Sequence, residues 1–120
     1  MATHAAVPIA EFIEGDVYRI YFSPRDREGR SHVGWFDLDL SRPQTPLEVS
    51  HQPLLSPGAA GDFDDAGAMG SWLLQVGARK YLYYIGWNRG VSVPFRNAIG
   101  LAISEDGGRT FSRVSRGPIL

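Results

Sequence analysis

Three aspartates stand within four positions of the stretch "GDFDDAGAMG", and carboxylates this close can bind a metal ion, transfer protons or cap a turn. Asp62, Asp64 and Gly67 match positions one, three and six of an EF-hand calcium loop. Position five is Ala66 and position twelve is Leu73, where the motif needs an oxygen ligand and a glutamate. The sequence therefore predicts no EF-hand. A calcium ion in a different oxygen cage stays open as an alternative, but we expect no metal and no cofactor.

Two of these aspartates, Asp64 and Asp65, are our candidates for catalysis. Glycoside hydrolysis uses two carboxylates, roughly 5–10 Å apart across the sugar bond. Consecutive side chains on an extended segment point to opposite faces, so both cannot face one substrate. We expect Asp65 to face the ligand, with Asp64 as the second choice and Asp62 as a turn residue.

A second set of candidates could bind a sugar. Trp87 could stack on the C–H face of a sugar ring, while Arg96 and Asn97 could form paired hydrogen bonds to hydroxyls or a carboxylate. Asn88 and Arg89 belong to the same loop, "GWNRGVSVPFRN". His4 could hydrogen-bond sugar hydroxyls, and His32 is a weaker candidate for the same role. Equally, Trp87 could cap a packed core, and a lone histidine in a strand-rich chain is more often a rim or core residue.

The composition narrows the function classes. Of the 120 residues, 43% are hydrophobic and 21% charged, with a formal net charge of −1, which is typical of a soluble globular domain. The basic residues are scattered, so we expect neither nucleic acid nor membrane as a partner. The absence of cysteine excludes disulfides, thiolate zinc sites and thiol nucleophiles. The first ten residues do not resemble a signal peptide, and we expect a cytoplasmic protein.

The elements that must position these residues are strands. The apolar runs are short, aromatic or β-branched, and bounded by Gly, Pro, Asn and Asp, which is typical of an all-β protein. The expected strands cover about 6–13, 17–23, 32–38, 46–50, 68–76, 80–87, 98–104 and 110–115. Leu82, Tyr83 and Trp72 are expected to pack between sheets.

The eight strands form two groups that repeat each other. Tyr18 and Tyr81 are 63 residues apart, Gly34 and Gly100 are 66 apart, and Pro53 and Pro118 are 65 apart. A recurring four-stranded unit predicts antiparallel β-propeller blades, with blade one at about 5–55 and blade two at about 63–120. Two unrelated hairpin pairs in a sandwich are the alternative.

One local motif supports blades. The stretch "SEDGGRTF", Ser104 to Phe111, fits the Asp-box pattern S-x-D-x-G-x-T-[WF], a turn between the outer strands of a blade. Asp106 can accept hydrogen bonds from the turn backbone, Gly107 and Gly108 can supply positive φ, and Phe111 can pack under the hairpin. Its expected role is structural.

From "HAAVPIAEF" through "YRIYFSPRD" and "GDFDDAGAMGSW" to the last residue, the chain resembles the five-bladed propeller superfamily of arabinanases, β-xylosidases, invertases, levansucrases and mannoside phosphorylases. More closely, it resembles a branch often encoded with surface-polysaccharide genes. The sucrose-cleaving members carry Arg-Asp-Pro near an inner strand. Here "PRDRE" supplies Arg25 and Asp26 without the proline, so we interpret both as turn or rim residues.

The resemblance implies a glycosidase-like propeller that acts on or binds a glycan. In that superfamily, inner-strand aspartates serve as base, nucleophile or transition-state stabiliser, and the general acid is usually a glutamate from a later blade. A non-catalytic propeller that binds glycan or protein is one alternative, and glycosyl transfer or phosphorolysis is another. Five blades need about 300 residues, so we expect a two-blade fragment that is inactive alone and self-associates through exposed blade edges.

Overall fold

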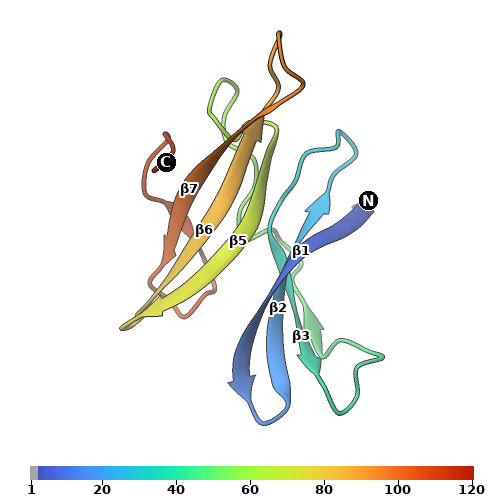
Figure 1. Ribbon diagram of the computed structural model, residues 1–120. Coiled ribbons are helices and arrows are strands. Elements are labelled where there is room, and N and C mark those ends of the chain that lie inside the picture. Colours follow the sequence, from blue (N-terminus) through green and yellow to red (C-terminus); the bar gives the residue numbers. More distant parts are fainter. Residues whose placement is uncertain (1–2) are drawn as a thin grey trace.

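The computed structural model describes residues 3–120, and these residues form eight β-strands and no helix (Figure 1). The strands are β1 (Thr3–Glu14), β2 (Val17–Arg25), β3 (Gly34–Asp39), β4 (Glu48–Val49), β5 (Gly67–Val76), β6 (Arg79–Asn88), β7 (Arg96–Ser104) and β8 (Ser112–Arg113). Each overlaps a strand that the sequence predicts. The outer strands β4 and β8 are shorter than expected, since each pairs with its neighbour over two residues. Because residues 3–120 form no helix, none in this part of the chain is long and apolar enough to cross a membrane.

The strands form two four-stranded antiparallel sheets, β1-β2-β3-β4 and β5-β6-β7-β8. Strand order in each sheet follows chain order, so each sheet is a meander of consecutive hairpins. In Figure 1 the two sheets lie beside each other with β1 and β5 adjacent. The predicted fold class, all-β with four-stranded antiparallel units of the blade type, is confirmed.

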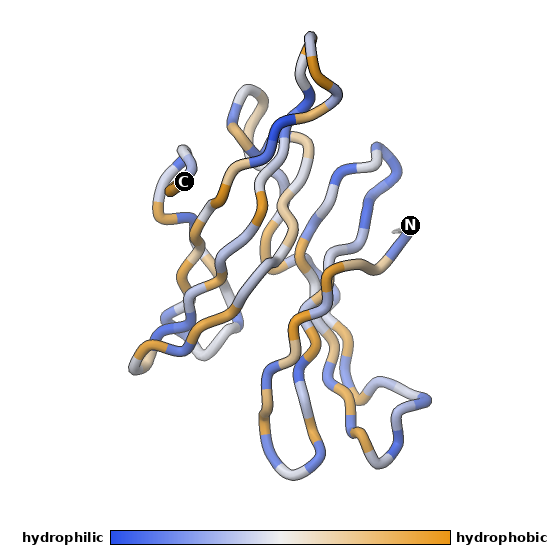
Figure 2. Tube along the Cα trace, in the orientation of Figure 1, coloured by the Kyte–Doolittle hydropathy of each residue, from blue (hydrophilic) through white to orange (hydrophobic). Residues whose placement is uncertain are grey.

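One hydrophobic core serves both sheets. Burial alternates along β6, where Leu82, Tyr84 and Gly86 are buried and their neighbours less so, as expected for a strand with one face inward. Figure 2 shows apolar and polar residues interspersed along the strands. The core cluster consists of Ile9, Tyr21, Val33, Leu55, Ala68, Leu82, Tyr84, Ala102 and Phe111.

The repeated glycines have a packing role. In sheet one, Phe22 lies opposite Gly34, and in sheet two, Tyr84 lies opposite Gly100. A Cβ atom added at Gly100 would lie 2.3 Å from the Tyr84 ring, and one at Gly34 would lie 3.5 Å from the Phe22 ring. The Tyr84 ring thus leaves no room for a Cβ at Gly100, whereas a Cβ at Gly34 would be in ordinary contact with the Phe22 ring.

Polar contacts join the two sheets at their inner strands. Ser31 forms a parallel bridge with Gly67, and Ser23 Oγ accepts a hydrogen bond from the Gly70 amide at 3.2 Å. Farther along β1, Lys80 Nζ lies 2.7 Å from Glu11 Oε1 in a half-buried ion pair. Because these contacts connect β1, β2 and the β2–β3 loop of one sheet with β5 and β6 of the other, the sheets are fixed relative to each other.

Two local expectations were wrong. Trp72 is 62% exposed, because a register shift between Gly70 and Trp72 reverses the alternation of β5 and turns Leu73 toward the core instead. The segment carrying Asp64 and Asp65 is a series of turns, and β5 starts after it at Gly67.

Candidate functional site

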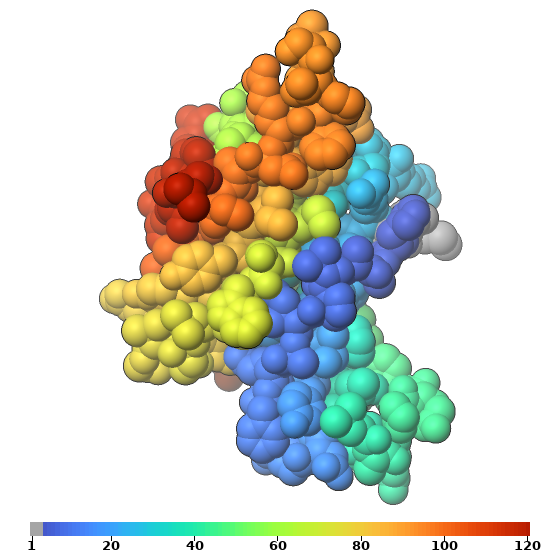
Figure 3. Space-filling model, in the orientation of Figure 1, coloured from blue at the N-terminus to red at the C-terminus, as the bar shows by residue number. Residues whose placement is uncertain are grey.

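Several strand ends and loops meet at one end of the molecule, which we call the mouth and define as residues 25–32, 58–66 and 87–97. Strand β1 starts and β2 ends there, paired through Thr3 and Arg25. Strand β5 starts there opposite the end of β6, paired through Gly67 and Trp87. In Figure 3 the β6–β7 loop stands beside the β2–β3 loop, where Arg89 Nη2 donates to the Glu28 carbonyl oxygen at 3.4 Å.

Asp65 lines a pocket of about 260 Å³ at the mouth, together with Glu28, Arg30, Ala66 and Arg89. We call this the Asp65 pocket. Its acidic groups are held differently: Asp65 Oδ2 accepts a hydrogen bond from the Gly61 amide at 2.9 Å, whereas Glu28 Oε2 is ion-paired with Arg30 Nε at 3.1 Å. Two carboxylates from opposite sheets therefore border one small cavity.

A second pocket, of about 440 Å³, adjoins the first through Arg89, which lines both. We call it the aromatic pocket. It is lined by Arg25, Met69, Ile85, Trp87, Arg89, Pro94, Phe95 and Asn97. The rings of Trp87 and Phe95 meet edge to face, with centroids 6.4 Å apart. The two pockets together offer carboxylates, guanidinium groups and aromatic surface at one site.

Asp64 occupies a different environment from its neighbour. Its side chain is 1% exposed, and its Oδ2 atom accepts hydrogen bonds from Tyr84 Oη at 3.1 Å and from Arg113 Nε at 2.9 Å. Burial, together with the Asp64 charge, raises the pKa of Tyr84 to about 12. The guanidinium of Arg113 also donates to the Ser56 carbonyl oxygen. Asp64 thus ties the turn before β5 to strand β8.

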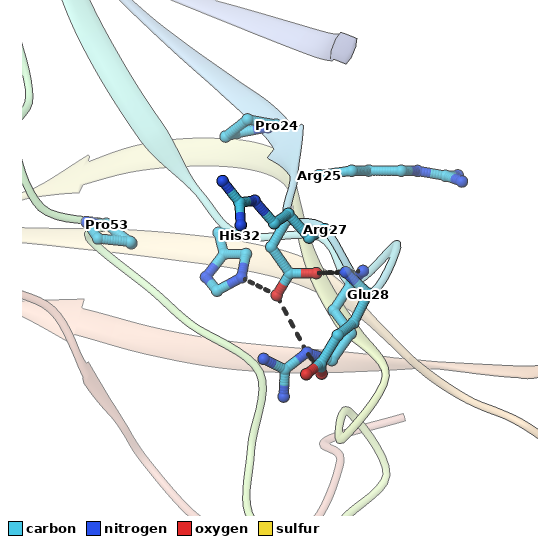
Figure 4. Close-up of a pocket in the computed structure, with 8 residues that line it drawn as sticks. Pro24, Arg25, Arg27, Glu28, His32 and Pro53 are labelled. Carbon is cyan, nitrogen blue, oxygen red and sulfur yellow. Dashed lines mark hydrogen bonds and ion pairs between the residues drawn. The ribbon is translucent and has the colours of Figure 1, made fainter. Parts of the chain in front are cut away.

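A third cavity, of about 410 Å³, is lined by the end of β2, by residues of the β2–β3 turn including Asp26, and by Pro53 (Figure 4). Asp26 Oδ1 accepts from the Glu28 and Arg30 amides, both at 2.9 Å. Its Oδ2 accepts from Arg30 Nε at 3.0 Å and His32 Nε2 at 2.9 Å. Burial acts to raise the pKa of Asp26, but the donors from His32 and Arg30 outweigh it and hold this pKa well below its usual range.

His32 connects this turn to the next segment. A carboxylate only accepts, so His32 Nε2 carries the proton that it shares with Asp26. Its Nδ1 atom lies 3.1 Å from Ser56 Oγ. Since all four donors to Asp26 stabilise the turn, this network is a scaffold that presents Glu28 and Arg30 to the Asp65 pocket.

The comparisons with known proteins support the fold and give no information on the role of the site. No family model matches the chain. Two curated relatives are 46% identical over 118 residues: Uncharacterized protein MT1551 of Mycobacterium tuberculosis strain CDC 1551 and Uncharacterized protein Rv1502 of strain H37Rv. These residues are 98% of this chain but 39% of each relative, so the chain spans about two fifths of their length.

Two solved structures share the fold. One is a complex of BT0996 and RGII, with a TM-score of 0.65 and 18% identity over 94% of this chain and 36% of the solved one. The other is a glycoside hydrolase, with a TM-score of 0.58 and 16% identity over the same shares. This chain has the fold of part of a glycoside hydrolase. The resemblance noted from the sequence is therefore supported at the level of fold.

The structure brings some of the predicted site residues together. Asp65 lines one mouth pocket, while Trp87 and Asn97 line the other. Among the residues described, neither His4 nor Arg96 is part of either lining: both lie exposed near strand ends, and His4 has a φ of 61°.

The sequence prediction missed Glu28, Arg25 and Arg30 as pocket residues. The turn was recognised from "PRDRE", and Asp26 does lie in it, but nothing local in that motif indicates that it shares a pocket with Asp65 and Ala66. Across residues 3–120, no group of three His, Asp or Glu side chains is arranged to hold a metal ion.

Proposed function

We propose that this chain forms two blades of a five-bladed, glycosidase-like propeller and binds carbohydrate at the mouth. The observation that carries the proposal is the position of Asp65, which lines a pocket with Glu28 and two arginines, beside a pocket with two aromatic rings. Aromatic surface with a few converging polar groups is the usual composition of a sugar site.

The lengths support the five-blade interpretation. Two of five equal blades make up two fifths of a propeller, and the chain covers 39% of its curated relatives and 36% of each solved structure. The Asp65 pocket would then open onto a funnel that further blades complete.

Within this proposal Asp65 is the carboxylate that faces the ligand, as base or transition-state stabiliser. Asp64 supports it, because its side chain is buried and bonded to Tyr84 and Arg113. Glu28 is ion-paired to Arg30 at the pocket edge and contributes to binding. The proton donor comes from a part of the protein outside this chain.

The test measures binding of a panel of methyl pentosides and hexosides to the 120-residue chain, detected by nuclear magnetic resonance. We expect weak binding of at least one glycoside, shown by shifts of the Gly61 amide and the Trp87 indole signal. Asp65→Asn keeps an acceptor for the Gly61 amide but removes the charge, and it should weaken that binding. Asp16→Asn, a charge-matched change in the exposed β1–β2 turn, should not.

Two results would contradict the proposal. Absence of binding to every glycoside would refute the carbohydrate site in this chain. Robust hydrolysis of aryl glycosides, abolished by Asp65→Asn, would show instead that the chain already contains its proton donor.

A further inference from the structure

We propose that the aromatic pocket selects a sugar that carries an anionic group, bound by the guanidinium groups of Arg25 and Arg89. The inference rests on the proposed carbohydrate function and adds the chemical class of the ligand. It predicts a preference for acidic over neutral sugars, which the proposed function alone does not.

The first support is the charge of the pocket lining. Arg25 and Arg89 are its two ionic groups, Asn97 is its neutral polar group, and the remaining lining is Met69, Ile85, Trp87, Pro94 and Phe95. No carboxylate belongs to this lining among the residues the structure describes. Two cations on an otherwise apolar wall repel each other, and an anion between them relieves that repulsion.

The second support is the pairing of arginines across the molecule. Within residues 3–120, five arginines have a carboxylate at ion-pair distance: Arg19, Arg30, Arg79, Arg113 and Arg116. Six have none, and four of these lie at the mouth: Arg25, Arg27, Arg89 and Arg96. Unpaired guanidinium groups are thus concentrated where the ligand would enter.

The acidic side chains of the neighbouring turns have other partners. Glu28 is held by Arg30 at 3.1 Å, and Asp65 accepts from the Gly61 amide in the adjoining pocket. The Arg89 side chain makes a long hydrogen bond to the Glu28 carbonyl oxygen, at 3.4 Å, through one of its five donors. In Figure 4 the Arg25 side chain extends away from the Asp26 network.

The pocket also fits the rest of such a ligand. Its volume of about 440 Å³ suits a sugar ring. The edge-to-face pair of Trp87 and Phe95 provides surface for the ring, and Asn97 can bond a hydroxyl. Arg25 ends β2 in one sheet, while Arg89 follows β6 in the other. A planar carboxylate between them can accept forked hydrogen bonds from both. Its binding should therefore be sensitive to replacement of either arginine by lysine.

The experiment compares three probes with the 120-residue chain at low ionic strength: methyl glucuronide, glucose 1-phosphate and neutral methyl glucoside. Dissociation constants come from titrations of the Trp87 indole signal. We expect the anionic sugars to bind about tenfold more tightly than the neutral one, and added salt to reduce the difference. The ratio between glucuronide and sugar phosphate identifies the acidic group preferred.

Matched variants assign the effect to the two side chains. Arg89→Gln and Arg25→Gln should each remove most of the preference, and Arg89→Lys should retain part of it because it keeps charge without the fork. Arg42→Gln makes the same charge change in the β3–β4 loop and should leave the preference intact. Amide spectra of each variant verify that the fold is unchanged.

The outcomes separate the two proposals. Equal affinity for anionic and neutral glycosides, or a preference that survives both Arg25→Gln and Arg89→Gln, would overturn the inference while the carbohydrate site stands. Binding of none of the three probes, together with none of the wider glycoside panel, would overturn both.

Discussion

The buried pair of Asp64 and Arg113 provides the sharpest test of how this chain is held together. Replacing Arg113 by Met retains the aliphatic stem but removes the guanidinium, leaving a carboxylate that is 1% exposed with Tyr84 as its remaining side-chain donor. Leaving a buried charge without its partner costs about 3–5 kcal/mol. Arg113→Met should therefore destabilise the chain strongly.

The reverse change should cost less. Asp64→Asn keeps the shape of the side chain and one oxygen acceptor, and it leaves a guanidinium that is 24% exposed and can be hydrated. The loss is one charge-assisted interaction, about 1.5–3 kcal/mol. In the double variant no buried charge remains, so Arg113→Met combined with Asp64→Asn should be more stable than Arg113→Met alone.

Urea unfolding, followed by tryptophan fluorescence and circular dichroism, measures these differences. With a slope of about 2 kcal/mol per molar urea, 3–5 kcal/mol moves the midpoint by roughly 1.5–2.5 M. A double variant that is less stable than Arg113→Met would refute the argument, because it would mean that the isolated carboxylate carries no penalty. If Arg113→Met is too unstable to fold, a folded double variant supports the same conclusion.

Three further predictions concern packing and pH. Gly100→Ala should destabilise the chain by about 1–3 kcal/mol in the same unfolding assay, because its Cβ would overlap the Tyr84 ring; an unchanged midpoint would contradict that. Gly67→Ala would place a Cβ 2.0 Å from Trp87 Nε1, so it should displace the indole signal and weaken sugar binding, whereas Gly117→Ala, whose Cβ would meet its nearest atom at 3.9 Å, should leave both unchanged. Because the pKa of Asp26 is lowered in the folded chain, ionised Asp26 stabilises the fold above its unfolded pKa of about 3.9, and this stabilisation is lost as pH falls below that value. The wild type should therefore lose more unfolding free energy between pH 5 and pH 3 than Asp26→Asn does. Equal losses would show that Asp26 is not the cause.

The strands could be predicted because their signals are local. Short apolar runs, aromatic or β-branched and bounded by turn residues, mark each strand, and Gly34 and Gly100 recur, each opposite an aromatic ring in its own sheet. The bulge between Gly70 and Trp72 has no comparable signal in the sequence. Strict alternation from Gly70 predicts that Trp72 faces the core, which is the opposite of the observed side. Local pattern therefore predicts sheet membership better than which side chain faces inward.

The site was predicted less completely because its contacts join distant segments. Asp64 is 49 residues from Arg113 in sequence, and Glu28 shares a pocket with Asp65 although 37 residues separate them. The prediction that Asp64 and Asp65 diverge assumed an extended segment. Their side chains do have different partners, but a turn produces this, fixed by the Asp65 amide donating to the Asp62 carbonyl oxygen at 3.2 Å.

That turn makes the two neighbouring aspartates depend on each other. The Asp64 side chain anchors to β8 through Arg113, which also binds the Ser56 carbonyl, so both ends of the 56–64 loop are fixed at one guanidinium. The Gly58 amide donates to the Asp64 carbonyl oxygen at 3.1 Å and closes the loop further. Asp65 follows directly and needs one more contact, from Gly61, to be held at the mouth. A buried carboxylate that binds no ligand can therefore determine where the ligand-facing carboxylate lies. The neighbouring acids Asp64 and Asp65 thus have two different roles, one as a structural anchor and one at the mouth, and do not share one reaction.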